Sequence, residues 1–292
     1  MTLKIRKLNP LFAAEVRGAD IAAALDDAVM AEIRAAFEEY SVLVLPDQDI
    51  DDDRQIDFSR RCFGELETHH AHSGNRDTHD RIARISNVDQ DGNVMPADDT
   101  RMQFRLGNRM WHADSSFKKV PSTASLLHAR AVVPEHGETE FASMRAAYAA
   151  LPKERRAMIE DRTVFHYHRN SRRHLNFQVT TDDEARRLPP VEHALVRANP
   201  VNGAKAMFIG AHASHIAGMP AVEARLLLED LLAFATRPQF VYSHQWRRGD
   251  LVIYDNRCVL HRARPYAWTQ HPRIMHRTTV AGDGPTVSAA AE

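Results

Sequence analysis

The sequence is poor in cysteine. Cys62 and Cys258 are the only two in 292 residues, and neither belongs to a C-x-x-C pair. Two cysteines cannot build a disulfide framework, and such low usage is typical of proteins that work in a reducing compartment. We therefore expect two ordinary thiols and a cytoplasmic location.

Membrane-spanning runs and an excess of one charge are also lacking. No window is long and apolar enough for a membrane span, and Asn9, Pro10 and Glu15 interrupt the N-terminal apolar stretch before it reaches signal-peptide length. The 38 basic and 39 acidic residues cancel to a net charge of −1 and form no long run of one sign. This balance argues against nucleic-acid or membrane partners. The expected partners are a small molecule and further copies of the chain in a homo-oligomer.

Several common active-site signatures are absent. The chain has no G-x-G-x-x-G, P-loop, G-x-S-x-G or H-E-x-x-H sequence and no cysteine pair for zinc. Their absence excludes the simplest dinucleotide, nucleotide-triphosphate, serine-hydrolase and zincin interpretations. Histidine and carboxylate side chains are left to carry the chemistry.

Hydrophobic periodicity predicts helices and a strand near the start of the chain. An aspartate pair at 26–27 can cap a helix that reaches Tyr40, and the apolar run 41–45 then forms a buried strand. A second helix is expected over 51–63, before Gly64, which is suited to end it.

From about residue 82 the pattern changes to short β-like runs separated by turn residues. These runs cover residues 82–88, 125–133, 163–167, 191–197, 206–209, 240–244, 251–254 and 275–280. Many short strands favour a mainly β fold, a sandwich or barrel, over an alternating βαβ array.

Two helices are expected within this strand-rich part, over 144–151 and 221–236. The expected core positions of the second helix are Leu226, Leu227, Ala233 and Phe234. No internal repeat or low-complexity linker divides the chain. We therefore expect one domain over 1–292, with 281–292 as a flexible tail.

Two His-x-Asp/Glu pairs, His112 with Asp114 and His136 with Glu138, are candidates for a metal site. With 17 histidines and 39 acidic residues in 292, chance alone supplies about two such pairs (17 × 39 / 292), so the spacing by itself carries little information. In an extended segment, however, His112 and Asp114 project to the same side.

Such a pair is the beginning of a facial triad. Two histidines and one carboxylate hold ferrous iron on one face and leave the other positions open. The third ligand is expected from the segment 255–261, which ends in His261 and follows a strand-like run. Beyond it, Arg273 and Arg277 would share one face of a strand about 13 Å apart, as clamps for two anionic groups.

Five motifs in order make the chain recognisable. They are H-A-D at 112–114, E-T-E-F-A-S-M-R-A-A-Y-A-A-L-P at 138–152, F-I-G-A-H-A-S-H at 208–215, D-N-R-C-V-L-H-R at 255–262 and R-I-M-H-R at 273–277. Together they closely resemble the alpha-ketoglutarate-dependent taurine/phenoxyacetate dioxygenase family, and within it the dichlorophenoxyacetate dioxygenases. The resemblance extends from the N-terminal helix and strand to about Val280.

The resemblance implies a fold, a metal site and a cosubstrate site. The fold is a double-stranded β-helix, a cupin-like jelly roll with peripheral helices. The implied Fe(II) ligands are His112, Asp114 and His261. Thr139 and Arg273 are implied to bind the distal carboxylate of alpha-ketoglutarate, which is a cosubstrate together with O2.

It also implies a substrate pocket for a small-molecule carboxylate. Arg277 would meet the anionic end of the substrate, and Asn108, Ser115 and His212 are expected to line the pocket. His215, close to His212, is an alternative contact.

Other histidines are given structural interpretations. His136 and Glu138 fall in the loop before Thr139 and read as a solvated turn. The cluster 69–72 is interpreted as a surface or pocket-lining loop. His166 and His168 are expected to be hydrogen-bonded partners in a strand rather than ligands.

The implied reaction hydroxylates the carbon beside the ether oxygen of an aryloxyacetate. The product collapses to a phenol and glyoxylate, while alpha-ketoglutarate gives succinate and CO2. The alternatives are a taurine or sulfonate dioxygenase, a zinc hydrolase that uses the same histidines, and a jelly-roll binding protein without activity.

Two departures from the family pattern are visible. Tyr254 stands where many relatives have tryptophan, and the interval from His261 to Arg273 is one residue longer than in close relatives. An exchange of roles between Arg273 and Arg277 therefore stays open.

Overall fold

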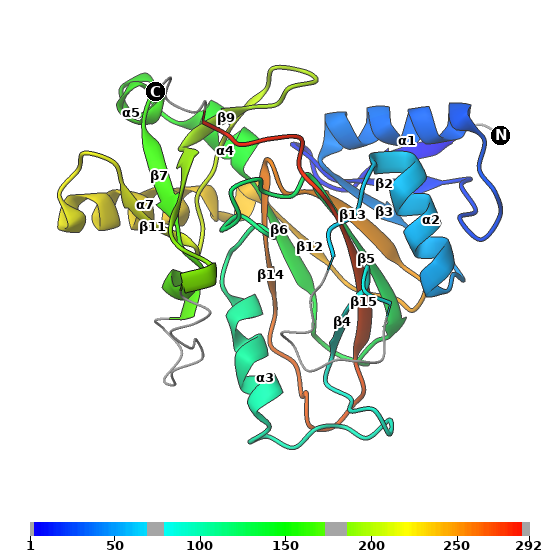
Figure 1. Ribbon diagram of the computed structural model, residues 1–292. Helices are drawn as coiled ribbons and strands as arrows, with labels where there is room; N and C mark the ends of the chain where they lie inside the picture. The colour runs from blue at the N-terminus through cyan, green and yellow to red at the C-terminus, as the bar shows by residue number, and fades with distance from the viewer. Residues whose placement is uncertain (1–2, 69–78, 173–185, 288–292) are drawn as a thin grey trace.

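Most strands of the protein belong to two facing sheets. The computed structural model describes residues 3–68, 79–172 and 186–287 (Figure 1). The larger sheet has seven strands, in the order β1 (Lys4–Lys7), β2 (Ala14–Arg17), β3 (Val42–Leu45), β13 (Leu251–Asp255), β5 (Ala124–Ala131), β15 (Ile274–Val280) and β4 (Ala83–Ser86). The smaller consists of β12 (Val241–His244), β6 (Thr139–Ser143) and β14 (Val259–Ala263). All of these neighbours pair antiparallel except β2 and β3.

Two minor sheets and the helices surround this pair. The minor sheets contain β11 (Ala213–Ile216), β7 (Thr163–His166) and β8 (Val191–Ala194), and β10 (Lys205–Met207) and β9 (Val196–Ala198). The helices include α1 (Asp27–Tyr40), α2 (Asp52–Phe63), α3 (Thr100–Arg105), α4 (Met144–Ala150), α5 (Lys153–Ile159) and α7 (Ala221–Ala235). The 3-10 turns are η1 (Leu106–Arg109), η2 (His168–Arg172) and η3 (Pro238–Phe240). The predicted mainly β fold is confirmed.

The capping signals near the start of the chain determine α1 and α2 as predicted. The side chain of Asp26 accepts a hydrogen bond from the first turn of α1, and Asp51 does the same for α2. α2 ends at Gly64, whose φ of 108° lies in the region that glycine tolerates best. Both helices lie against the large sheet in Figure 1.

Side chains of α2 fix which face of β15 looks outward. The hydroxyl of Ser59 lies 2.7 Å from that of Thr278, and Asp52 hydrogen-bonds His276 over 2.6 Å. Because successive residues of a strand alternate in direction, the odd-numbered residues of β15 point the other way, toward the smaller sheet. Arg273 and Arg277 share this inner face, as the spacing predicts.

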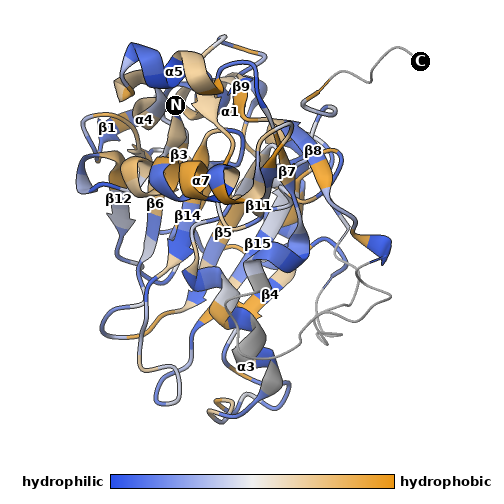
Figure 2. Ribbon diagram, turned by 90° about the vertical axis from the view of Figure 1, so that its left-hand side faces the viewer, coloured by the Kyte–Doolittle hydropathy of each residue, from blue (hydrophilic) through white to orange (hydrophobic). Residues whose placement is uncertain are grey.

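The expected buried face of α7 is confirmed only in part. Leu226 and Ala233 are exposed, whereas Leu227 and Phe234 are half-buried and pack against the core. The fully buried residues are instead Ala224, Leu228, Leu231 and Ala235. Apolar residues occur nearly all round this helix, as the mixed colouring of α7 in Figure 2 shows, so their pattern does not define a single buried face. The small alanines at both ends allow close packing and select the observed face.

The described part of the expected tail is held against the body of the protein. The Thr286 hydroxyl accepts a hydrogen bond from the backbone N–H of Ala194 and lies 2.8 Å from Nδ1 of His193. Residues 288–292 lie outside the described part of the chain. Among the described residues, no helix has the length and apolar character needed to cross a membrane.

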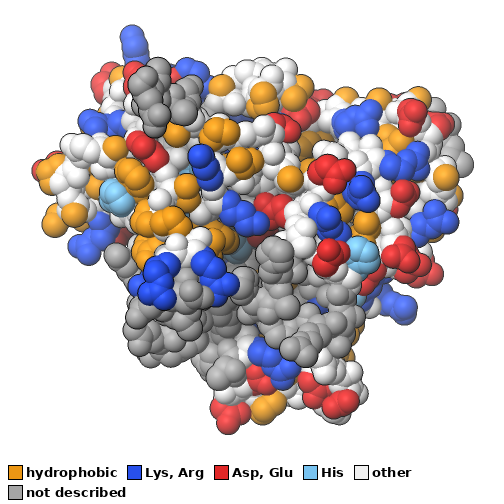
Figure 3. Space-filling view, viewed as in Figure 1, with side chains coloured by type: hydrophobic (Ala, Val, Ile, Leu, Met, Phe, Trp, Pro, Cys, Tyr) orange, Lys and Arg blue, Asp and Glu red, His pale blue; other side chains and the backbone are white. Residues whose placement is uncertain are grey.

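Charged side chains of both signs are intermixed on the face shown in Figure 3.

The interior of the protein contains two apolar cores. One lies between α1 and the inner strands, and the other fills the space around β6, β10 and β14. Ile253 is completely buried in the first core and pairs in register with Leu43 on one side and Leu126 on the other.

We expect Ile253→Ala to lower the free energy of unfolding by about 2–5 kcal/mol, because it leaves a cavity between three strands. The exposed Val201→Ala is the matched control, with a change within about 0.5 kcal/mol. Urea denaturation measures both. Equal effects of the two substitutions would show that the β13 core does not carry the stability of this sheet.

Candidate metal centre

Backbone pairing brings together the two histidines that the sequence proposes as ligands. His112 and His261 form an isolated antiparallel bridge, in which the N–H of each donates to the carbonyl of the other at 3.1 and 2.8 Å. Their ring centroids are only 4.2 Å apart. The bridge attaches the segment before β5 to β14, so two distant parts of the chain present imidazoles side by side.

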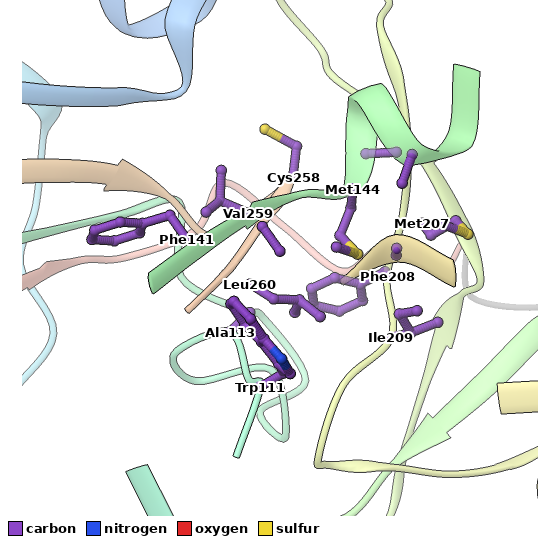
Figure 4. Close-up of a cluster of buried hydrophobic side chains, with 14 of the residues drawn as sticks. Trp111, Ala113, Phe141, Met144, Met207, Phe208, Ile209, Cys258, Val259 and Leu260 are labelled. Atoms are coloured by element: carbon purple, nitrogen blue, oxygen red, sulfur yellow. The ribbon is translucent and has the colours of Figure 1, made fainter. Parts of the chain in front are cut away.

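Apolar neighbours set the direction in which His112 points. Trp111 and Ala113 are buried beside Leu260 and Phe208 in the cluster drawn in Figure 4. Since residues alternate along an extended segment, burial of the residues on both sides turns His112 to the opposite face.

Gly210 lets a further segment approach this bridge. A Cβ at this position would lie 3.0 Å from the carbonyl oxygen of Trp111 and 3.5 Å from Cα of His112, and the φ of 121° is one that other residues rarely adopt. The next N–H, of Ala211, donates to Trp111 O at 2.8 Å. This contact places His212 next to the bridge.

Asp114 lies in a polar cage. Its Oδ2 accepts hydrogen bonds from Ser125 at 2.7 Å and from Tyr254 at 2.9 Å, and its Oδ1 forms an ion pair with Arg277. The backbone N–H of Asp114 donates a hydrogen bond to the side-chain oxygen of Asn256. Burial opposes ionisation of the carboxyl, but Arg277, the neighbouring histidines and the hydrogen bond from Ser125 together outweigh it and hold the pKa of Asp114 below its ordinary value.

The histidines are suited to donate lone pairs. Burial, reinforced by neighbouring His112, lowers the pKa of His261 to about 3, so this imidazole is neutral at physiological pH. Its Nε2 lies 3.9 Å from Oδ2 of Asp114. His112 directs Nδ1 to the carbonyl of Met110 at 2.8 Å, a contact that fixes the ring as outer partners do in metal sites.

The three side chains fit a divalent metal. One ligand atom from each of His112, Asp114 and His261 lies within 4.8 Å of the others, and no other such group of three occurs among the described residues. Two histidines and one carboxylate are the donor set that non-haem Fe(II) prefers.

Arg273 lies further along the inner face, in a pocket. It is buried, and its Nη2 donates to the carbonyl of Gly137 at 3.1 Å. Thr139, two residues after Gly137, accepts a hydrogen bond from the indole of Trp246 at 2.9 Å. A hydroxyl that accepts here still has its own proton to donate.

The candidate substrate residues are divided between two places. Asn108 lines the same pocket as Arg273. His212 is buried with its ring centroid 6.3 Å from that of His112, and Ser116 hydrogen-bonds its Nδ1. The hydroxyl of Ser115 donates a hydrogen bond to Glu67 at 2.7 Å, so in this structure it stabilises the loop that contains Ser115.

The remaining histidines occupy varied environments. His136 is exposed, and so is His215, which stacks on Phe165 with centroids 4.4 Å apart. His166 is completely buried and bonds the carbonyl of Phe208. His168 packs against an aromatic ring rather than beside the three candidate ligands. The cluster 69–72 lies outside the described residues.

Sequence reasoning missed most of the supporting residues. Ser125 and Asn256 hydrogen-bond each other as well as Asp114, and Trp246 holds Thr139. A polar residue at an inward position of an apolar strand, as Ser125 is in β5, was the available signal. Trp246 follows its strand in a turn and offered none.

We expect His261→Ala to weaken Mn(II) or Fe(II) binding more than about 100-fold, since loss of even an outer partner of a ligand costs about 10- to 100-fold. His215→Ala is the matched control, because that histidine is exposed and distant from the bridge. Metal content after dialysis measures binding, and circular dichroism checks folding. A folded His261→Ala protein with unchanged affinity would exclude His261 as a ligand.

Comparisons with known proteins find relatives over nearly the whole chain. The model of a family described as "Taurine catabolism dioxygenase TauD, TfdA family" matches residues 4–279. The chain is 41% identical to the alpha-ketoglutarate-dependent 2,4-dichlorophenoxyacetate dioxygenase of Cupriavidus pinatubonensis, with 96% of this chain and 98% of the relative covered. It is 37% identical to the (S)-phenoxypropionate/alpha-ketoglutarate-dioxygenase of Sphingobium herbicidovorans, covering 98% of each.

A solved structure is also similar. The crystal structure of AAD-2 in complex with Mn(II) and N-oxalylglycine superposes with a TM-score of 0.91 at 43% identity, over 99% of this chain and 100% of that one. Identity and coverage of this extent confirm the resemblance seen in the ordered motifs. The chain belongs to the TauD/TfdA dioxygenase family.

Proposed function

We propose that the protein is an Fe(II)- and alpha-ketoglutarate-dependent dioxygenase that hydroxylates aryloxyacetates beside the ether oxygen, giving a phenol and glyoxylate. The observation that carries the proposal is the buried group His112, Asp114 and His261, with one arginine on its carboxylate and a second in an adjoining pocket. The dichlorophenoxyacetate and phenoxypropionate relatives support the substrate class.

The three residues His112, Asp114 and His261 hold the metal in this proposal. Bound Fe(II) supplies the oxidation of substrate by O2, coupled to conversion of alpha-ketoglutarate to succinate and CO2. Burial keeps the His261 imidazole neutral and the carboxylate of Asp114 is ionised, so these two donors are ready without loss of a proton. Ser125 and Tyr254 orient the carboxylate.

Arg273 and Thr139 bind the distal carboxylate of alpha-ketoglutarate. The guanidinium of Arg273 is buried, has one bond to a carbonyl and reaches the pocket. The proton of the Thr139 hydroxyl is the second donor. The contact of Arg277 with Asp114 puts Arg277 at the metal end of the inner face, which supports this division of roles over the exchanged one.

Arg277 meets the carboxylate of the main substrate. One of its amino groups holds Asp114, while its buried Nε has no hydrogen-bond partner among the described residues. A buried guanidinium donor without a partner is costly, and an anionic substrate group would satisfy it. Fixing that carboxylate brings the adjacent carbon to the metal rather than the ring.

An aromatic wall favours an aryl ether over taurine or another sulfonate. The ring of Phe117 lies 4.7 Å from that of His168 and 5.0 Å from that of His212, which in turn faces His112. Flat rings of this kind pack against an aryl group, whereas a short aminosulfonate would leave them unfilled. The wall is thus the observation that selects the substrate within the family.

Two histidines and a carboxylate would also suit zinc in a hydrolase. A hydrolase would release product without oxygen or alpha-ketoglutarate, so the same assay performed anaerobically separates the two. A binding protein would turn over neither cosubstrate. Membership of the TauD/TfdA family favours the dioxygenase.

Finer features of the molecule are part of the proposal. We place the chain in one domain, a double-stranded β-helix (jelly roll), supported by the two facing antiparallel sheets. Self-association into a homo-oligomer is supported by Val222 and Leu226, which are exposed on one helix. The two buried, unpaired cysteines are compatible with a cytoplasmic location.

With Fe(II) and alpha-ketoglutarate, we expect oxygen uptake, succinate and phenol in equal amounts when dichlorophenoxyacetate is added. Taurine or no substrate should give at most slow, uncoupled uptake. An oxygen electrode and chromatography of products measure this. Turnover with taurine alone would keep the dioxygenase and reject the aryl substrate, and no turnover of a metal-loaded protein would reject both.

The substitution Phe117→Leu tests the aromatic wall. We expect the KM for the aryloxyacetate to rise about threefold to tenfold, since a ring contact contributes about 0.5–1.5 kcal/mol, while the KM for alpha-ketoglutarate stays unchanged. Phe234→Leu on α7 is the matched control. An unchanged KM for the aryl substrate in Phe117→Leu would place the ring elsewhere.

A further inference from the structure

The pocket that contains Arg273 is lined by one sign of charge only. Its lining includes four arginines, Arg105, Arg109, Arg264 and Arg273, together with Tyr266, and no acidic residue. The outer surface in Figure 3 mixes both signs. A single-sign pocket with low-dielectric walls concentrates ions of the opposite charge.

Most of this positive charge is not neutralised within the protein. Arg264 lies 3.7 Å from a carboxylate oxygen of Glu140. Arg105, Arg109 and Arg273 form no ion pair with any acidic side chain of the described residues. One bound carboxylate on Arg273 would still leave two guanidinium groups without a counter-charge.

Arg105 is less exposed to solvent than Arg109. It is half-buried on the last turn of α3, where its Nη1 contacts the sulfur of Met102 at 3.7 Å. Burial lowers its pKa to about 10, so the side chain remains positively charged at physiological pH. A partly buried charge without a partner destabilises the folded protein unless a ligand compensates it.

The arginines converge on one phenol. Burial raises the pKa of Tyr266, and the positive charges of Arg273, Arg105 and Arg109 all oppose that rise. The Arg273 guanidinium lies 5.5 Å from the centre of the Tyr266 ring. Arg105, Arg109 and Arg273 therefore act on the same phenol and line the same pocket.

We propose that Arg105 and Arg109 form an outer subsite of the cosubstrate pocket that captures the distal carboxylate of a 2-oxo dicarboxylate and selects dicarboxylates over 2-oxo monocarboxylates. The inference rests on the proposed function, because it takes Arg273 as the inner carboxylate clamp. The outer pair acts on the second negative charge of alpha-ketoglutarate, and a monocarboxylate of the same length has no such charge.

The test measures equilibrium binding without turnover, by titration calorimetry of the Mn(II)-loaded protein. N-oxalylglycine is the dicarboxylate probe, and 2-oxopentanoate is a monocarboxylate of the same chain length as alpha-ketoglutarate. The variants are Arg105→Gln and Arg109→Gln. Arg248→Gln, an exposed arginine outside the pocket lining, is the matched control.

We expect the Kd of N-oxalylglycine to rise about tenfold in Arg105→Gln and about threefold in Arg109→Gln at low salt, because the first side chain is less exposed to solvent. Both effects should shrink between about 30 mM and about 300 mM ionic strength. The Kd of 2-oxopentanoate should not change, and Arg248→Gln should match the wild type.

Three results would overturn the inference. Equal N-oxalylglycine affinity in all variants would leave the proposed function standing and reject the outer subsite. Equal losses for both probes would show that the arginines only support the fold of α3. A loss of N-oxalylglycine affinity that does not shrink between about 30 mM and about 300 mM ionic strength would show that the arginines do not act through their charge. Failure of N-oxalylglycine to bind the wild type would instead reject the proposed function itself.

Discussion

The two backbone hydrogen bonds between His112 and His261 are the constraint on which the site depends. They join segments that are far apart in the chain and place two imidazole rings 4.2 Å apart, centre to centre. Apolar packing of Trp111 and Leu260 holds both strands at this register. A slip by one residue would turn both histidines into the core, so packing and metal-site geometry are coupled.

Electrostatics then set the protonation of the site. Arg277 keeps the buried Asp114 ionised, and burial keeps His261 neutral. The inner face of β15 continues from this ion pair to Arg273 and the arginine-lined pocket. One arginine therefore lies at the candidate metal ligands and four line the pocket, which fits the anionic ligands that we propose.

The sequence predicts the local structure where a short-range signal exists. Asp26, Asp51 and Gly64 mark helix ends that the structure shows at those positions, and the mainly β character follows from the many short strands. The bounds of α7 were predicted well, but its buried face only in part. Leucines on several sides of the helix are compatible with more than one buried face, and only the packing of Ala224 and Ala235 determines which face is buried.

The candidate site was predictable from ordered motifs more than from spacing. The His-x-Asp/Glu spacing of His112 and Asp114 occurs about as often as chance alone predicts. The third residue, His261, was inferred through family resemblance. Ser125, which bonds Asp114, offered only the signal of a polar residue in an apolar strand. Trp246 could not be predicted, because its partner Thr139 is brought close only by the pairing of strands distant in sequence. The same is true of the arginine-lined pocket, whose walls come from α3, η1, β4 and the segment after β14.

A crystal structure of the protein with Mn(II) and N-oxalylglycine tests the central claim most directly. The account predicts one metal bound by His112, Asp114 and His261, with the distal carboxylate of the analogue on Arg273 and Thr139. Metal bound elsewhere, or a distal carboxylate held by Arg277, would contradict it.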